Sequence, residues 1–245
     1  MAKFAVIVVA AGKSERFEGK EKKIFAKISD RPLFIRTLEH FINREDVCQT
    51  ILVVAPEDQN HMKEKYAANL AFMGVKLVEG GAERPDSVAN GLEAAQEDAD
   101  YVAVHDAART CVTEAMIDAV FAEAVKSWAA ILAATFRGTI KRGSDAGVID
   151  QTVPRENLWE AQTPQVFKRS VIVEAYEKRG EFEGLPTDDA QLVEAAGHPV
   201  SLVESDFSNL KITTRSDITL AQAIIRSRPK VAPKGPRMPF EEAQW

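Results

Sequence analysis

The chain has 245 residues, of which 45% are apolar and 28% charged, and its formal net charge is −6. These proportions are typical of a soluble globular protein, and the length suits one large α/β domain or two small ones. An acidic balance does not favour nucleic-acid binding, so clustered basic residues are expected to serve a local anionic ligand. The apolar run over residues 4–11 is too short to cross a bilayer, and the start of the chain lacks signal-peptide features. We therefore expect a cytoplasmic protein that binds neither nucleic acid nor membrane.

The two cysteines, Cys48 and Cys111, form no CxxC pair and have no zinc-ligand spacing. Both are expected to be reduced, with a single disulfide as the alternative.

Apolar runs and helical patterns alternate through the first 135 residues. Strands are expected, in chain order, at Phe4–Val9, Thr50–Ala55, Val75–Val78, Tyr101–His105 and Ala130–Thr135. A helix is expected after each of the first four strands. The first helix is expected at 32–42, with Pro32 in its first turn, and the second at about 58–71. The third is expected to be capped by Asp86 or Ser87, and the fourth to lie at 113–126. This alternation predicts a three-layer α/β fold in which helices cover both faces of a mostly parallel sheet.

The pattern changes after residue 135. Two short, polar-flanked strands at 139–142 and 147–153 surround a glycine-containing turn, which predicts a β-hairpin that protrudes as an arm. The remaining elements are expected as helices at 170–179, 187–196 and 215–226 and a strand at 200–204. Residues 1–226 are thus interpreted as one domain, and the proline-rich tail at 227–245 is expected to be disordered or draped over the surface.

Small residues follow the first strand. Ala10, Ala11 and Gly12 leave the backbone bare, so that its N–H groups can approach a phosphate, and Lys13 and Arg16 add positive charge. The pattern fits neither the dinucleotide fingerprint nor the P-loop, and a tight turn with exposed basic residues is the alternative.

A basic run continues this loop at Lys20, Lys22 and Lys23. Such a run is most often a solvated surface. Beside a phosphate-binding loop, however, one lysine can act as a point charge on a phosphoryl oxygen.

Two further polar clusters lie where predicted strands end. Gly80, Gly81 and Ser87 belong to a glycine-rich turn that precedes a helix. This segment is either a simple turn followed by a helix cap, or a surface against which a base or ribose binds. Asp106 and Arg109 follow a buried strand, where Asp106 can hold Mg²⁺ or pair with Arg109 at the surface. Carboxyl ends of parallel strands share one edge of a sheet, so these clusters predict one ligand site there.

Other polar residues are scattered, and spacing alone does not separate them from ordinary surface residues. His105 is interpreted as a structural histidine. The remaining candidates are Arg155, Thr163, Thr187, Asp188, Asp189 and Lys211.

Taken together, these motifs resemble those of the 2-C-methyl-D-erythritol 4-phosphate cytidylyltransferases of the nonmevalonate isoprenoid pathway. The resemblance covers about residues 4–224. The matching motifs are Ala10-Ala11-Gly12 with Arg16 and Lys23, Gly80-Gly81 with Arg84 and Ser87, His105-Asp106-Ala107-Ala108-Arg109, Thr139 with Lys141, Arg155 with Leu158-Trp159, Gln162-Thr163-Pro164-Gln165, Thr187-Asp188-Asp189-Ala190, and Asn209 with Lys211-Ile212-Thr213.

The resemblance implies a role for each matching position. The expected catalytic residues are Arg16 and Lys23 at the α-phosphate of CTP, and Arg155 and Lys211 at the acceptor phosphate. The expected nucleotide-binding residues are Ala10, Ala11, Gly12, Lys13, Gly81, Arg84, Ser87, Asp106 and Ala107. The expected acceptor-binding residues are Arg109, Thr139, Arg155, Thr163, Thr187 and Lys211. Asp106 would also hold Mg²⁺, and the arm at 137–157 would form a homodimer.

The implied reaction is transfer of CMP from CTP to 2-C-methyl-D-erythritol 4-phosphate, with release of pyrophosphate. The acceptor phosphate is already an anion, so catalysis needs positioning and charge stabilisation and no general base. The chain departs from the family pattern at Lys22, Gly138, Pro154 and Thr110. The alternatives are a cytidylyltransferase for another polyol phosphate, such as ribitol 5-phosphate, and a non-catalytic nucleotide-binding protein.

Overall fold

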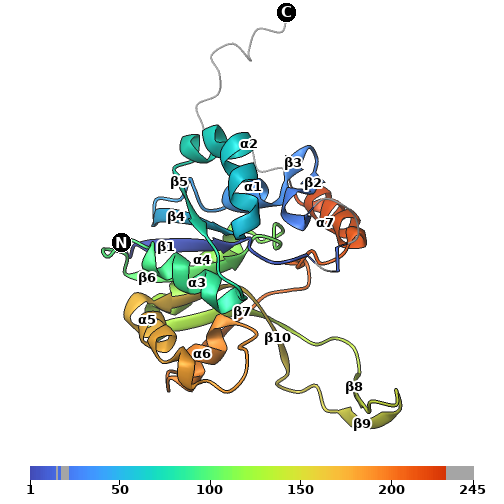
Figure 1. Cartoon of the computed structure of the whole chain (residues 1–245). Coiled ribbons are helices and arrows are strands. Elements are labelled where there is room, and N and C mark those ends of the chain that lie inside the picture. Colours follow the sequence, from blue (N-terminus) through green and yellow to red (C-terminus); the bar gives the residue numbers. More distant parts are fainter. Residues whose placement is uncertain (15, 18–21, 230–245) are drawn as a thin grey trace, which may run out of the picture.

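The computed structural model describes residues 1–14, 16, 17 and 22–229. A seven-stranded sheet of order β11-β7-β10-β6-β1-β4-β5 forms its centre (Figure 1). The strands are β1 (Phe4–Val9), β4 (Val47–Val54), β5 (Val75–Glu79), β6 (Tyr101–Asp106), β7 (Ala129–Thr135), β10 (Trp159–Lys168) and β11 (Ser201–Glu204). Neighbours are parallel except for β10, which runs antiparallel to both β6 and β7. The predicted mostly parallel sheet is confirmed.

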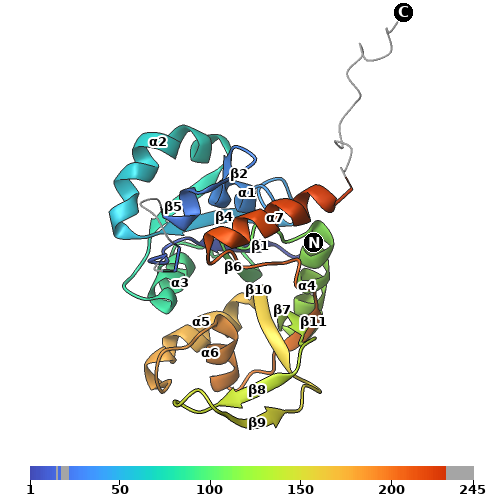
Figure 2. The same cartoon turned by 90° about the vertical axis from the view of Figure 1, so that its right-hand side faces the viewer.

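Helices cover both faces of the sheet (Figures 1 and 2). One face packs against α1 (Leu33–Leu38), α2 (Gln59–Phe72) and α4 (Glu114–Ser127), and the other against α3 (Arg84–Glu93), α5 (Arg169–Glu177) and α6 (Asp189–Ala195). A smaller apolar cluster lies under α7 (Arg215–Ser227), beside the two-stranded β2 (Lys27–Ile28) and β3 (Arg31–Pro32). None of the described helices is long and apolar enough to cross a membrane.

Strand β1 is buried on both sides, which explains its uninterrupted apolar sequence. In β1, Val6 and Val8 pack into the cluster with α1, α2 and α4, whereas Ala5 and Ile7 pack into the cluster with α3, α5 and α6. Burying both faces of β1 fixes where its carboxyl end, and so the loop after it, must lie.

Strand β10 is the strand of the seven-stranded sheet that the sequence analysis did not predict. It contains the polar segment around Gln162, Thr163 and Gln165 and also Pro164, a residue that normally argues against a central strand. The ladder with β7 is irregular between Ala161 and Gln165, so Pro164 sits where pairing is interrupted. The polar side chains of β10 are thereby carried into the middle of the sheet, next to β6.

Two helix starts differ from expectation. Helix α3 begins at Arg84 with Glu83 as its N-cap, and Asp86 completes a capping box, so neither Asp86 nor Ser87 is the cap. Pro32 is the N-cap of α1 and not a first-turn residue, and α1 ends at Leu38. The chain then continues in turns through residue 43.

The predicted hairpin is present as β8 (Ile140–Gly143) and β9 (Ile149–Val153), and it extends away from the sheet as an arm (Figure 1). At its tip, Val148 and Ile149 are 64% and 62% exposed. Both cysteines are free, Cys111 being buried. Most of the proline-rich tail lies outside the described residues.

Candidate functional site

A cleft of about 460 Å³ lies at the carboxyl edge of the sheet, above β1 and β6 and beside the start of α3. The predicted residues that line it are Ala10, Ala11, Gly12, Lys13, Arg16, Lys23, Gly81, Arg84, Ser87, Asp106 and Lys211. Parallel strands bring these segments to one edge, although they are far apart in sequence. The predicted common site at this edge is therefore present.

The loop after β1 offers only part of its backbone to the cleft. The Ala10 N–H donates to Val53 O at 2.7 Å and belongs to the sheet. Among the described residues, none accepts a hydrogen bond from the backbone N–H of Ala11, Gly12 or Lys13. A Cβ on Gly12 would meet nothing within 4 Å. The loop thus presents unshielded N–H groups beside Lys13 and Arg16, as an anion site requires.

The glycine turn before α3 is sterically constrained. A Cβ on Gly81 would lie 2.2 Å from Asp86 Cβ, so only glycine fits there. Ser87 is not a helix cap: its Oγ accepts from the Gly81 N–H at 3.1 Å and donates to Glu83 O at 3.2 Å. The hydroxyl holds the turn in place at the wall of the cleft.

The two neighbouring lysines have different surroundings. Lys22 forms ion pairs with Glu57 at 2.8 Å and Asp58 at 2.7 Å, outside the cleft. Lys23 lines the cleft, where burial lowers its pKa and the nearby Lys211 lowers it further. Lys20 lies outside the described residues. The geometry therefore singles out Lys23 as the lysine that can meet an anion in the cleft.

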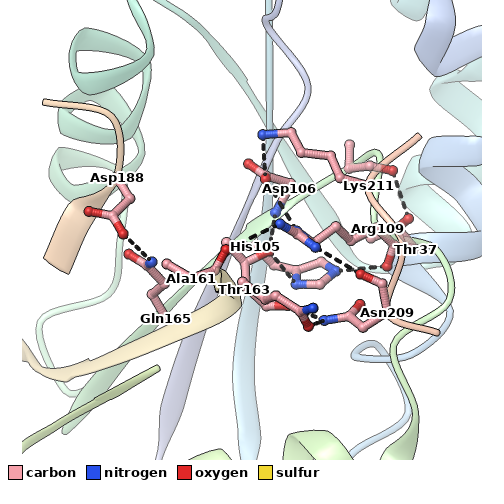
Figure 3. A network of polar contacts seen from close by, with 12 residues as sticks. Thr37, His105, Asp106, Arg109, Ala161, Thr163, Gln165, Asp188, Asn209 and Lys211 are labelled. Carbon is pink, nitrogen blue, oxygen red and sulfur yellow. Dashed lines mark hydrogen bonds and ion pairs between the residues drawn. The ribbon is translucent and has the colours of Figure 1, made fainter. Parts of the chain in front are cut away.

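Asp106 ends β6 and is only 7% exposed. Its carboxylate lies 2.8 Å from Lys211 Nζ and 3.7 Å from Arg109 Nε (Figure 3). It also lies 3.7 Å from Arg84 Nε. Burial alone would raise the pKa of Asp106, but Lys211, Arg84 and Arg109 outweigh it and hold this pKa well below its usual range. Asp106 does pair with Arg109, as the alternative had it, but the pair is not at the surface, because Arg109 is itself only 6% exposed.

The base of the site is a buried polar network (Figure 3). His105 Nδ1 lies 3.1 Å from Thr163 Oγ1, and His105 Nε2 lies 3.2 Å from Arg109 O. The Asp106 N–H donates to the same Thr163 hydroxyl at 3.0 Å. Complete burial lowers the pKa of His105 to about 3, so its ring is neutral at pH 7. The interpretation of His105 as a structural residue is confirmed, and Thr163 links it to Asp106.

A second, smaller cavity of about 130 Å³ adjoins the cleft. Arg84, Asp106 and Lys211 line both cavities. The other predicted residues that line the second cavity are Arg109, Thr163, Thr187 and Asp188. Arg84, Asp106 and Lys211 thus form a charged junction between the large cleft and the small cavity.

Three predicted residues lie elsewhere. Ala107 is buried in the core and its N–H donates to Val9 O at 3.0 Å, so Ala108 lines the cleft in its place. Thr139 and Arg155 lie on or beside the arm and line neither cavity; Arg155 donates to Arg137 O. A single chain does not bring these two residues into the site.

Asn209 and Gln165 organise the site, yet the sequence analysis matched them to motifs without giving them a role. Asn209 Nδ2 donates to Gln162 Oε1 at 2.9 Å and to Thr163 O at 3.0 Å, and Arg109 Nη1 donates to Asn209 O at 2.8 Å. Gln165 Oε1 accepts from the backbone N–H groups of Asp189 and Ala190, both at 3.0 Å. Their positions in the Gln-Thr-Pro-Gln and Asn-x-Lys motifs were the only available signal.

Within the described part of the chain, no group of three or more His, Cys, Asp or Glu side chains could hold a metal ion. Asp106 therefore contributes a single carboxylate, and a metal bound there would need most of its oxygen ligands from elsewhere.

Comparisons with known proteins agree with this geometry. The sequence model of the 2-C-methyl-D-erythritol 4-phosphate cytidylyltransferase family matches residues 4–227. A protein of that name from Rhodopirellula baltica is 42% identical, with 91% of this chain and 95% of the relative covered. A second, from Geobacillus kaustophilus, is 37% identical, with 92% and 98% covered.

Solved structures give the same result. The Thermus thermophilus 2-C-methyl-D-erythritol 4-phosphate cytidylyltransferase superposes with a TM-score of 0.74 at 31% identity, with 90% of this chain and 98% of that chain covered. The 4-diphosphocytidyl-2C-methyl-D-erythritol synthase from Anaerococcus prevotii gives a TM-score of 0.78 at 27% identity, with 92% and 96% covered.

Proposed function

The chain belongs to the 2-C-methyl-D-erythritol 4-phosphate cytidylyltransferase family, and from this premise we propose how its residues carry out the reaction. It is a nucleotidyltransferase that moves CMP from CTP to 2-C-methyl-D-erythritol 4-phosphate in isoprenoid biosynthesis. The observation that supports the assignment of the site is the junction of two cavities at Arg84, Asp106 and Lys211.

CTP occupies the large cleft. Its phosphates bind the free N–H groups of Ala11, Gly12 and Lys13, with the charges of Lys13 and Arg16 beside them. The cytosine lies against the glycine turn at Gly81, where the lack of side chains lets backbone atoms contact the base. The 460 Å³ volume supports this placement, since it lies in the range of small-molecule sites.

Fixed positive charge stabilises the transition state. As the acceptor oxygen attacks the α-phosphorus, Lys23 and Arg16 stabilise the charge on the phosphoryl oxygens from the cleft, and Lys211 does so from the junction. Lys211 is held by Asp106 at 2.8 Å, so its position is set before the substrates bind. Preorganised charge of this kind is the main way in which proteins catalyse phosphoryl transfer.

The acceptor occupies the second cavity. Arg109, Thr163 and Thr187 bind its sugar part and phosphate there, next to Lys211. The small volume suits a polyol phosphate better than a nucleotide, and the shared wall supports a position of its phosphate beside that of CTP. Because both reacting groups are already bound side by side, the reaction step itself loses little translational and rotational entropy.

Mg²⁺ is held by Asp106 together with the phosphates of CTP. The residues fit such an ion only as part of a ternary site, because one carboxylate is available. When bound, Mg²⁺ would neutralise charge on the phosphate oxygens. Without Mg²⁺, Asp106 pairs with Lys211 at 2.8 Å, and this contact holds the lysine in place.

The acceptor site is completed by a second copy of the chain. Thr139 and Arg155 lie on or beside an arm that extends away from both cavities of its own chain, and the arm tip exposes Val148 and Ile149. A two-stranded hairpin of this kind is marginal when it is solvated on all sides. The arms therefore pair in a homodimer and deliver Arg155 to the partner, and the dimer works in the cytoplasm.

The direct test of the substrates is pyrophosphate release by the purified protein with each of four nucleoside triphosphates. The acceptors are 2-C-methyl-D-erythritol 4-phosphate and ribitol 5-phosphate. Turnover with CTP and the methylerythritol phosphate is expected. A preference for ribitol 5-phosphate would overturn the acceptor, and no turnover with any pair would overturn the enzyme assignment.

A further inference from the structure

A buried polar chain reaches the junction of the two cavities from the α5–α6 side of the sheet. The Tyr176 hydroxyl donates to Asp189 Oδ1 at 2.6 Å. Arg84 binds the same carboxylate through both terminal nitrogens, Nη1 at 3.0 Å and Nη2 at 2.8 Å. The three residues come from α5, α6 and α3, so their contacts join elements that are distant in the sequence.

Asp189 is completely buried and fixed from several sides. It is the first residue of α6, where Asp188 caps the helix through a hydrogen bond from the Gln191 N–H at 3.1 Å. The Asp189 N–H donates to Gln165 Oε1 at 3.0 Å. Neither the backbone nor the side chain of Asp189 has freedom to move, and it lines neither cavity.

Arg84, by contrast, is 23% exposed through its side chain and lines both cavities. Its two terminal nitrogens face Asp189, whereas its Nε lies 3.7 Å from Asp106 Oδ1. The guanidinium therefore lies between two carboxylates, one with structural contacts only and one at the reaction centre. A bidentate contact fixes the plane as well as the position of the guanidinium.

We propose that Asp189 and Tyr176 are positioning residues that hold the Arg84 guanidinium at the junction of the CTP cleft and the acceptor cavity. The inference rests on the proposed placement of the substrates. Without the bidentate contact, Arg84 turns toward Asp106, which is already within 3.7 Å. It then competes with Lys211 for the carboxylate, and the cations that face the phosphates lose their alignment.

The protonation states agree with this role. Burial raises the pKa of the Tyr176 hydroxyl, and Asp189 raises it further, so the hydroxyl remains a donor. Burial lowers the pKa of Arg84, but Asp189 and Asp106 outweigh that effect and raise it, so the guanidinium stays charged. Tyr176 and Arg84 can therefore both donate hydrogen bonds to Asp189 at pH 7.

The other explanation is that the cluster only joins α3, α5 and α6 for stability. A double-mutant cycle separates the two. Tyr176→Phe removes one hydroxyl and leaves the ion pair in place, and Arg84→Met removes the charge with little loss of volume. The kinetic parameters kcat and KM, for CTP and for the acceptor, are measured for the wild type, each single variant and the double variant. A melting curve is recorded for each of these proteins.

The positioning role predicts that Tyr176→Phe lowers kcat/KM about tenfold, the scale of one hydrogen bond to a charged group. Asp189→Asn lowers kcat/KM about a hundredfold, the scale for a misplaced catalytic group, mainly through kcat. In the Arg84→Met background Tyr176→Phe causes no further loss of kcat/KM, because the residue to be positioned is gone.

Matched controls carry the same chemical changes at the opposite edge of the sheet. Tyr101→Phe removes a hydroxyl that reaches Val125 O at 3.5 Å, and Asp46→Asn alters a carboxylate that binds Arg44 at 2.9 and 2.7 Å. Both variants should keep wild-type kcat/KM.

The proposal is overturned if Tyr176→Phe keeps wild-type kinetics. It is also overturned if its loss of kcat/KM is the same with and without Arg84, or if the losses in kcat/KM simply follow the melting temperature. Absence of turnover in the wild type itself would instead overturn the proposed substrates, so the two failures are distinguishable. If Asp189→Asn does not fold, the Tyr176→Phe and Arg84→Met cycle still decides the matter.

Discussion

The carboxyl edge of the sheet carries most of the predicted site residues, and the β8–β9 arm carries two of them. The two regions differ in how these residues are held. At the sheet edge, Arg109 and Lys211 both form ion pairs with Asp106, and Asp106 and Arg109 are buried. On the arm, Thr139 and Arg155 lie in an exposed region away from both cavities.

On the proposed placement of the substrates, this difference teaches that one chain preorganises the nucleotide chemistry by itself, whereas a second chain completes its acceptor site. Packing fixes the positions of the charged groups at the sheet edge before a substrate binds. The position of a charged group on the extended arm depends on which surface the arm contacts. Variants at the sheet edge should therefore reduce kcat, and variants on the arm should act through the acceptor and the oligomeric state.

The largest effect is expected at Lys23. Lys23→Ala removes a charge that faces the cleft and should lower kcat by about 10²–10³-fold. Lys22→Ala is the matched control, because Lys22 pairs with Glu57 and Asp58 outside the cleft. Steady-state kinetics on both variants would contradict the assignment if Lys22→Ala proved the more damaging change.

Asp106→Asn should lower turnover by about 10²-fold and raise the Mg²⁺ concentration needed for half-maximal activity. Asp106→Asn should also lower the stability of the fold. Because Asp106 balances Lys211, Arg84 and Arg109 in a largely buried setting, its loss should destabilise the fold by about 3 kcal/mol rather than leave it unaffected. A normal Mg²⁺ titration together with normal turnover would exclude the metal role.

On the arm, Arg155→Ala should raise KM for the acceptor by roughly tenfold and leave KM for CTP unchanged, as expected for loss of one charged contact. Arg142→Ala, on the same arm, is the control and should have wild-type kinetics. If Arg155→Ala raises KM for CTP by as much as KM for the acceptor, the division between the two regions is wrong.

The smallest effect concerns pH and stability. The pKa of Asp106 is lower in the folded protein than in the unfolded chain, so Asp106 stabilises the fold above the unfolded value of about 3.9 and this contribution is lost as pH falls. The stability difference between the wild type and Asp106→Asn should therefore shrink between pH 6 and pH 3 in urea unfolding. A difference that grows as pH falls would contradict this sign.

Much of the sheet edge could be predicted from the sequence for a simple physical reason. Strands buried on both faces, such as β1 and β6, have uninterrupted apolar sequences, and parallel strands bring their carboxyl ends together. The loops at Gly12, Gly81 and Asp106 follow those ends, so their common location was predictable.

The rest depends on contacts that no local pattern encodes. Strand β10 carries Pro164 and several polar residues, which are tolerated because the ladder is interrupted there and the polar side chains contact His105, Asp106 and Asn209. Ala107 looked like part of the site in its motif, but it is buried in the core, in the turn that follows β6. The pairing of Arg84 with Asp189 spans 105 positions and was visible only in the fold.

The central claim is that one chain supplies the sheet-edge charges and a second chain supplies Arg155. Co-expression of Lys23→Ala and Arg155→Ala subunits with two different tags, followed by purification through both tags, isolates the mixed dimer. In that dimer one site has both wild-type residues and the other has neither. We expect kcat/KM for the acceptor, per dimer, to recover to about half the wild-type value, above that of either parent variant, as two-fold symmetry requires. A purified mixed dimer no more active than the two parent variants would contradict it.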